Sequence, residues 1–107
     1  MSGAITELQN ENDFQTETQS GVVLVDFFAT WCRPCQMQLP ILEGVAVKIG
    51  DQAKFLKVDT DKFGAIAQKF EVSSIPTLVI LKNGNVVERF TGLQQEDALV
   101  STLQAQM

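Results

Sequence analysis

Apolar residues recur along the chain at two spacings, one typical of buried strands and one typical of amphipathic helices. The clearest strand covers residues 22–29, VVLVDFFA, which is apolar at every position but one. A strand that is apolar on both faces is typical of a sheet covered by helices on both sides. Residues 34–49 follow the helical spacing i, i+3, i+4, i+7. The apolar residues at that spacing are Leu42, Val45, Ala46 and Ile49.

The same two spacings, with turn residues between them, predict the remaining elements. Further strands are predicted at residues 4–8, 54–59, 77–82 and 86–91. Further helices are predicted from residue 11, around residues 63–70 and over residues 94–106. Asn83-Gly84 between two strands is the strongest short hairpin signal. The order β-α-β-α-β-α followed by β-β-α predicts an α/β fold, with parallel strands joined by right-handed crossovers and an added antiparallel hairpin.

Two helices contain residues that affect their ends or their shape. Asn10 is the predicted N-cap of a first helix that starts at Glu11 and turns Phe14 inward. Pro40 falls inside the long second helix and is expected to kink it, because proline removes a backbone hydrogen bond.

Length and charge limit the classes of function. A chain of 107 residues predicts one domain over residues 1–107, long enough to bury a core without disulfides. The net charge of −5 without a basic run argues against partners such as nucleic acid or anionic membrane lipid. Met1–Ser20 has no basic start followed by an apolar stretch, and no apolar run approaches the ~18 residues of a membrane helix. We therefore expect a soluble, cytoplasmic protein.

The candidate chemistry centres on Cys32-Arg33-Pro34-Cys35, which contains the only two cysteines of the chain. Pro34 suits the first turn of the predicted helix, because that position needs no N–H. Free backbone N–H groups and the positive end of the helix dipole then surround the Cys32 sulfur. This environment favours the thiolate, which is the reactive form of cysteine.

Two other interpretations of the cysteine pair compete with a redox dithiol. A structural disulfide would close only a four-residue ring, worth roughly 2 kcal/mol against ~3 kcal/mol for a fifteen-residue loop. A structural zinc site needs four ligands, usually Cys or His, and the chain has two Cys and no His. A cytoplasmic disulfide is usually transient and catalytic. The redox dithiol is therefore the favoured interpretation.

Asp26 is the one charged residue of the strongest strand. An unpaired carboxylate in that position is costly, and buried carboxylates near reactive centres commonly have a raised pKa. Lys57, near the same level of the next parallel strand, is the expected partner. The alternatives are an Asp26 that faces solvent and a Lys57 whose long stem reaches water.

The chain resembles thioredoxin over essentially its whole length. The motif, its spacing and the order of elements all agree with that family. The matching stretches are Val25-Asp26-Phe27-Phe28-Ala29-Thr30-Trp31-Cys32-x-Pro34-Cys35, Pro40, Val58-Asp59, Ser74-Ile75-Pro76-Thr77, Asn83-Gly84 and Gly92. The resemblance implies the thioredoxin fold, a five-stranded mixed sheet of order 1-3-2-4-5 with two helices on each face.

The resemblance also implies a catalytic role for four residues. Cys32 would attack substrate disulfides, and the more buried Cys35 would resolve the mixed disulfide. Asp26, through water or Lys57, would handle the proton on Cys35.

Substrate docking is implied at residues around this dithiol. The Ile75–Pro76 bond would be cis and face the dithiol, although the dipeptide alone predicts trans. Backbone groups of Ile75 would pair with an extended substrate, and an exposed Trp31 beside a reactive group is typical of a docking surface. The expected substrate-binding residues are Trp31, Arg33, Pro34, Ile75, Pro76 and Gly92.

Three positions depart from the family pattern. Arg33 replaces the usual glycine, and a cation ~7 Å from the sulfur interacts with the thiolate by about 0.6 kcal/mol at a dielectric of 80 and roughly 2.4 kcal/mol at 20. That would stabilise the reduced form and make the couple more oxidising, unless Arg33 is fully solvated. Gln36 replaces a common lysine, and Phe28 replaces a usual tryptophan, which should alter packing more than chemistry.

The combined expectation is a thiol–disulfide oxidoreductase, a redox carrier that reduces protein disulfides through its dithiol. The resemblance implies no cofactor besides the Cys32–Cys35 disulfide, re-reduction by an NADPH-dependent thioredoxin reductase, and a monomer. Two alternatives stay open. One is a more oxidising oxidase or isomerase, and the other is a binding subunit in which the dithiol is incidental.

Overall fold

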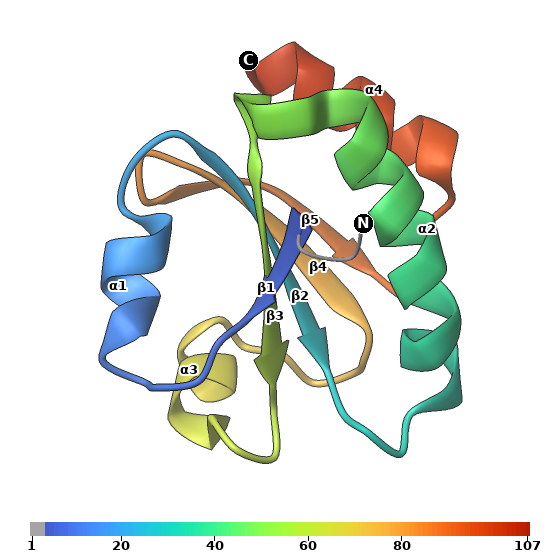
Figure 1. The fold of residues 1–107 in the computed structure, drawn as a ribbon. Coiled ribbons are helices and arrows are strands. Elements are labelled where there is room, and N and C mark those ends of the chain that lie inside the picture. Colours follow the sequence, from blue (N-terminus) through green and yellow to red (C-terminus); the bar gives the residue numbers. More distant parts are fainter. Residues whose placement is uncertain (1–3) are drawn as a thin grey trace.

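A computed structural model describes residues 4–107 of the chain, and within them five strands and four α-helices follow one another in the expected order (Figure 1). The strands are β1 (Ile5–Glu7), β2 (Val22–Phe28), β3 (Lys54–Asp59), β4 (Thr77–Lys82) and β5 (Asn85–Thr91). The helices are α1 (Asp13–Thr18), α2 (Arg33–Ile49), α3 (Gly64–Lys69) and α4 (Glu96–Gln106), with a 3₁₀ turn η2 (Gly50–Gln52) after α2.

The five strands form one mixed sheet in the order β1-β3-β2-β4-β5. β3 pairs in parallel with both β1 and β2, while β4 pairs antiparallel with β2 and β5. The central strand β2 is buried at every position. This confirms the expected fold, because β2 is hydrogen-bonded on both edges and covered on both faces.

Two hydrophobic cores lie on the two faces of the sheet. Val23, Val25 and Phe27 of β2 pack with residues of α1 and α3, whereas Val22 and Leu24 pack with residues of α2 and α4. Alternate side chains of a strand point to opposite faces, so one apolar strand contributes to both cores. Figure 1 shows α1 and α3 on one side of the sheet and α2 and α4 on the other, which confirms two helices on each face.

The start of α1 differs from the prediction. α1 begins at Asp13, and its N-cap residue is Asn12, whose side chain makes no capping hydrogen bond. The Asn10 side chain instead accepts a hydrogen bond from the backbone N–H of Asn12 at 3.0 Å, and the Asn10 carbonyl accepts one from Asp13 at 3.0 Å. Asn10 therefore forms a local turn before the helix, as Asn side chains often do. Phe14 is buried as predicted.

The long helix α2 continues through Pro40 to Ile49. The four apolar positions that predicted it are all buried against the sheet. A kink at Pro40 stays a prediction. None of the helices in residues 4–107 is both long and apolar enough to cross a lipid bilayer.

The hairpin between β4 and β5 turns at Asn83-Gly84 as predicted. Both residues have positive φ, 52° and 85°. Positive φ at two successive residues is the requirement of the tightest hairpin turns, and Asn-Gly meets it best. The turn returns β5 along β4 at the edge of the sheet.

Candidate active site

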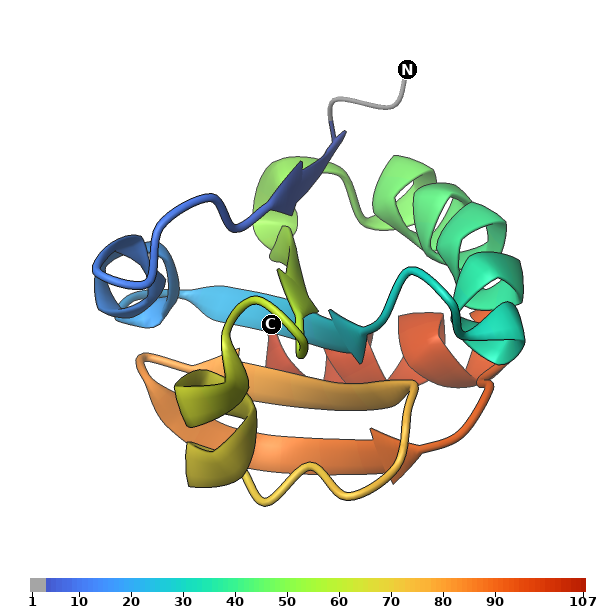
Figure 2. The same cartoon turned by 90° about the horizontal axis from the view of Figure 1, so that it is seen from below.

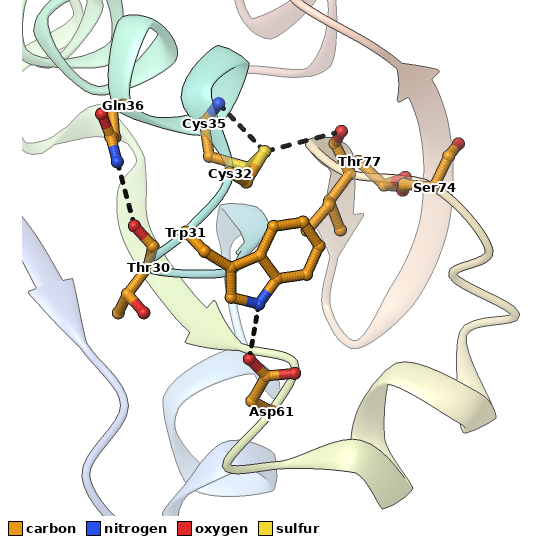
Figure 3. The surroundings of a disulfide bond; sticks show 9 residues. Thr30, Trp31, Cys32, Cys35, Gln36, Asp61, Ser74 and Thr77 are labelled. Atoms are coloured by element: carbon orange, nitrogen blue, oxygen red, sulfur yellow. Dashed lines mark hydrogen bonds between the residues drawn. A yellow bond between two sulfur atoms is a disulfide. The ribbon is translucent and has the colours of Figure 1, made fainter.

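The dithiol lies where the central strand gives way to the long helix (Figures 1 and 2). Cys32 is the N-cap residue of α2, and its Sγ accepts a hydrogen bond from the backbone N–H of Cys35 at 3.3 Å. Cys32 and Cys35 form a disulfide, with their Cα atoms 5.2 Å apart (Figure 3). The Cys32 sulfur is therefore at the positive end of the helix dipole, a position that stabilises a thiolate once the disulfide is reduced.

Apolar side chains cover the disulfide on its protein side. Phe28, Ala29, Cys32 and Cys35 form a small buried cluster, with Ile75 packed against it. Cys32 and Cys35 are each 5% exposed. The expectation that Cys35 is the more buried residue is therefore wrong for this disulfide form, because the cluster encloses both cysteines.

The loop before β4 approaches the dithiol from the other side. The carbonyl oxygen of Ile75 lies 3.8 Å from Cys32 Sγ, and the Ile75–Pro76 bond is cis. The cis bond agrees with the resemblance and overturns the trans expectation from the dipeptide alone. The Gly92 N–H donates to the Pro76 carbonyl at 2.8 Å. Three segments distant in sequence, at Cys32, Ile75 and Gly92, are thus brought together.

Trp31 is 70% exposed beside the disulfide. Its indole Nε1–H donates to Asp61 Oδ2 at 2.9 Å, as Figure 3 shows. A pocket of about 210 Å³ lies between Trp31 and residues 72–75. The sequence analysis missed Asp61, which fixes the indole in place. No periodicity or motif marks that contact, since the two side chains are exposed and thirty positions apart.

Asp26 is buried in β2 and is only 2% exposed. Within residues 4–107, its Oδ1 has no hydrogen-bond partner. Burial raises the pKa of Asp26 to about 7, and the nearby charge of Lys57 only partly opposes that shift. Asp26, Lys57 and Cys35 together line a cavity of about 200 Å³. The cavity has room for water, at about 30 Å³ per molecule, between the carboxyl group and the second cysteine.

Lys57 stands in register with Asp26, as the sequence analysis predicted. Its ammonium, however, lies 3.8 Å from the carboxylate of Glu7 and 4.6 Å from the centre of the Phe28 ring. The expected pairing with Asp26 is therefore an interaction through space and not an ion pair. Phe28 has a double role, since it covers the disulfide and supports the lysine.

Arg33 and Pro34 are exposed in the first turn of α2, next to Cys32. Across residues 4–107, no carboxylate lies within ion-pair distance of the Arg33 guanidinium. The cation is therefore available to the dithiol and to a substrate. Gln36, the other departure in this turn, donates from its side chain to the Thr30 carbonyl at 2.9 Å (Figure 3).

Gln38 is a second residue that the sequence analysis missed. It is fully buried, and its side-chain amide makes two hydrogen bonds to the backbone of Gln94. Nε2 donates to the Gln94 carbonyl at 3.0 Å, and Oε1 accepts from the Gln94 N–H at 2.8 Å. We call this pair of bonds the Gln38 clamp. It ties α2 to the segment that follows Gly92, and it explains why α4 starts at Glu96 and not at residue 94.

A signal for Gln38 was present in the sequence. The buried positions of α2 are Cys35, Gln38, Leu42, Val45, Ala46 and Ile49. Gln38 continues the apolar stripe towards the dithiol, so a polar residue there should have raised the question of its partner.

No metal site competes with the dithiol in the part of the chain that the structure describes. Residues 4–107 contain no group of three or more His, Cys, Asp or Glu side chains placed to hold an ion. What the site offers is a disulfide at a helix terminus, a buried titratable carboxyl group that lines a cavity with Cys35, and the exposed aromatic side chain of Trp31. That set is suited to thiol–disulfide exchange.

Comparisons with known proteins agree with this geometry. The family model for thioredoxin matches residues 4–105. A thioredoxin-like protein of Synechocystis is 51% identical over 82 residues, covering 77% of this chain and 78% of that protein. Thioredoxin of Bacillus subtilis is 46% identical over 89 residues, covering 83% and 86%. The solved structure of a mutant thioredoxin from Halobacterium salinarum superposes with a TM-score of 0.86 at 36% identity, covering 95% of this chain and 89% of that one.

Proposed function

Because the chain belongs to the thioredoxin family, we propose that it reduces disulfides in other proteins through Cys32 and Cys35 and is itself re-reduced by a thioredoxin reductase. Family membership together with the disulfide-forming pair makes it a thiol–disulfide oxidoreductase. The observation that carries the finer proposal is the Cys32 sulfur at the N-terminus of α2, next to a buried carboxyl group of raised pKa. A cytoplasmic monomer is the setting we propose.

In the first step the Cys32 thiolate attacks one sulfur of a substrate disulfide. A Cys32–substrate disulfide forms, and the other substrate sulfur leaves as a thiolate. The N–H of Cys35 and the dipole of α2 stabilise the attacking thiolate. No cofactor takes part, because the electron pair comes from the dithiol.

In the second step Cys35 resolves the mixed disulfide. The Asp26 carboxylate accepts the proton of the Cys35 thiol through water in the shared cavity. The resulting Cys35 thiolate attacks Cys32 Sγ, the Cys32–Cys35 disulfide forms, and the second substrate sulfur leaves as a thiolate. A carboxyl group with a pKa of about 7 is suited to this transfer, since it gains and loses a proton near neutral pH.

Docking of the substrate is proposed at the rim around Cys32. The exposed Trp31 and the half-buried Ile75 and Gly92 offer apolar surface. The exposed Arg33 and Pro34 complete the rim, and the buried Pro76 lies behind it next to Ile75. An extended substrate would pair with the Ile75 backbone beside the sulfur.

Trapping of the intermediate tests this assignment. We expect reduced Cys35→Ser to accumulate a disulfide-linked complex with insulin, whose disulfides serve as substrate, because the resolving thiol is gone. Mass spectrometry identifies the linked sulfur, and Cys32→Ser is the matched control that should form no such complex. A complex through Cys35 in that control, with none through Cys32 in the first variant, would reverse the two roles.

A further inference from the structure

Three charged residues form a row across the first strands of the sheet. Glu7 of β1 is in register with Lys57 of β3, and Lys57 is in register with Asp26 of β2. In-register residues of neighbouring parallel strands point to the same face. Lys57 therefore has a carboxyl group on each side, one at the edge of the sheet and one at its centre.

The ammonium of Lys57 is paired with the outer of these two carboxyl groups. It lies 3.8 Å from Glu7 Oε1 and 4.6 Å from the centre of the Phe28 ring. Among residues 4–107, Asp26 is not within ion-pair distance of it, and Asp26 Oδ1 has no hydrogen-bond partner. The side chains of Lys57 and Glu7 are 19% and 35% exposed, so their pair sits at the solvent edge of the site.

We propose that Glu7 is a positioning residue for proton transfer: it holds the Lys57 ammonium at the edge of the sheet and so keeps Lys57 from forming an ion pair with Asp26. The proposal rests on the role proposed above for Asp26 in the resolving step. It assigns a function to a short edge strand that otherwise contributes little to the site.

The physical consequence concerns the basicity of Asp26. An ammonium in contact with a carboxylate favours the charged form and lowers its pKa. Without Glu7, Lys57 is free to pair with Asp26, and a paired Asp26 would be ionised and a weaker base near neutral pH. Glu7 thus keeps the carboxyl group titrating in the range where Cys35 must lose its proton.

The other groups that lie near Asp26 do not respond to Glu7 in the way that Lys57 does. Helix α2 contributes Cys35 to the shared cavity, and β4 places the apolar Leu78 in register with Asp26. Asp59, the other carboxylate at this end of β3, accepts backbone hydrogen bonds from the turn that follows it, at 2.9 and 3.4 Å. Lys57 is therefore the charged group whose position Glu7 can change.

A titration of Asp26 tests the proposal. We expect Glu7→Gln to lower the pKa of Asp26 in the reduced protein by about half a unit to one unit, the effect of moving a unit charge ~2 Å closer at an effective dielectric of ~20. The side-chain carboxyl carbon, followed by NMR, reports this directly. Glu17→Gln is the matched control, because it removes a similar exposed ion pair, Glu17–Lys54 at 3.4 Å, away from the site. An unchanged Asp26 titration in Glu7→Gln overturns the proposal.

Repeating the Glu7→Gln change in a Lys57→Met variant separates the positioning of Lys57 from a direct effect of the Glu7 charge on the pKa of Asp26. In Lys57→Met, Glu7 has no lysine to hold, so adding Glu7→Gln should leave the Asp26 titration where it is. A shift of equal size in both backgrounds would mean that Glu7 acts by its own charge and would overturn the positioning role. The rate of the resolving step against pH tests the underlying function separately. If Asp26→Asn leaves that profile unchanged, the proposed role of Asp26 fails, while the NMR result on Glu7 still stands.

Discussion

Replacing Asp26 with alanine should stabilise the protein at neutral and higher pH. Its pKa rises from 3.8 to about 7 on folding because the carboxyl group is buried. The shift of ~3 units corresponds to about 4 kcal/mol at 1.36 kcal/mol per unit. Between these two pKa values the folded protein binds more protons than the unfolded chain, so its stability falls as pH rises from about 4 to 7. Against a typical total of 5–15 kcal/mol, that is a large fraction.

The difference in stability between Asp26→Ala and the parent should therefore depend on pH. We expect it to be smallest near pH 4, to grow in favour of the variant, and to level off above pH 7. The lost side-chain contacts of Asp26 add a cost that does not vary with pH, so the slope is the diagnostic quantity. Urea unfolding of the oxidised proteins at several pH values measures it, with exposed Asp51→Ala as the control of equal charge change. A difference that is constant from pH 4 to pH 8 would refute the argument from burial.

Two further variants address residues at the edge of the dithiol. Arg33→Gly should move the thiolate absorbance titration of Cys32 to higher pH by roughly half a unit to two units, and lower the reduction potential near neutral pH by at most a few tens of millivolts. Equilibration with glutathione measures the potential, and a variant equal to the parent at low salt would show that Arg33 is a solvated surface charge. Gln38→Met should lower the free energy of unfolding by about 1–3 kcal/mol, because the N–H and C=O of the half-buried Gln94 lose their partners. It should also raise KM for a protein disulfide more than it lowers kcat, since the clamp holds the segment after Gly92. The exposed Gln104→Met is its control, and equal kinetics in both variants would leave the clamp a purely structural role.

The elements could be predicted from the sequence because burial alternates with a regular period. β3 and β4 begin and end at the predicted residues, and the apolar stripe of α2 is buried as predicted. The starts of α1 and α4 each differ from the prediction by two residues, and both lie next to hydrogen bonds between a side chain and the backbone. Asn10 bonds to its own turn, and the backbone of Gln94 bonds to Gln38, a residue more than fifty positions away. No periodicity contains that information.

In the candidate site, the positions of residues could be predicted from the sequence, but contacts between side chains of different elements could not. Residues that follow one another on β2 and α2 could be placed from the chain alone, and so could Lys57, because parallel register sets its level beside Asp26. The contacts of Asp61 with Trp31 and of Glu7 with Lys57 could not. They join side chains from different segments that are at least partly in water, where neither burial nor spacing restricts the choice of partner.

Asp26, Lys57 and Glu7, the row of charged residues across the sheet, differ in burial in the order of their strands. Exclusion of water raises the pKa of a carboxyl group, and in this sheet that condition is met in β2, which is buried at every position. Lys57 and Glu7, on strands nearer the edge, keep part of their side chains in water and can stay charged. The gradient of burial from β2 to β1 therefore places the carboxyl group of raised pKa at the centre of the sheet and the ion pair nearer its edge. A lysine at position 26 would instead be a desolvated cation in the central strand, and an aspartate at position 7 would lose the burial that raises the pKa of Asp26.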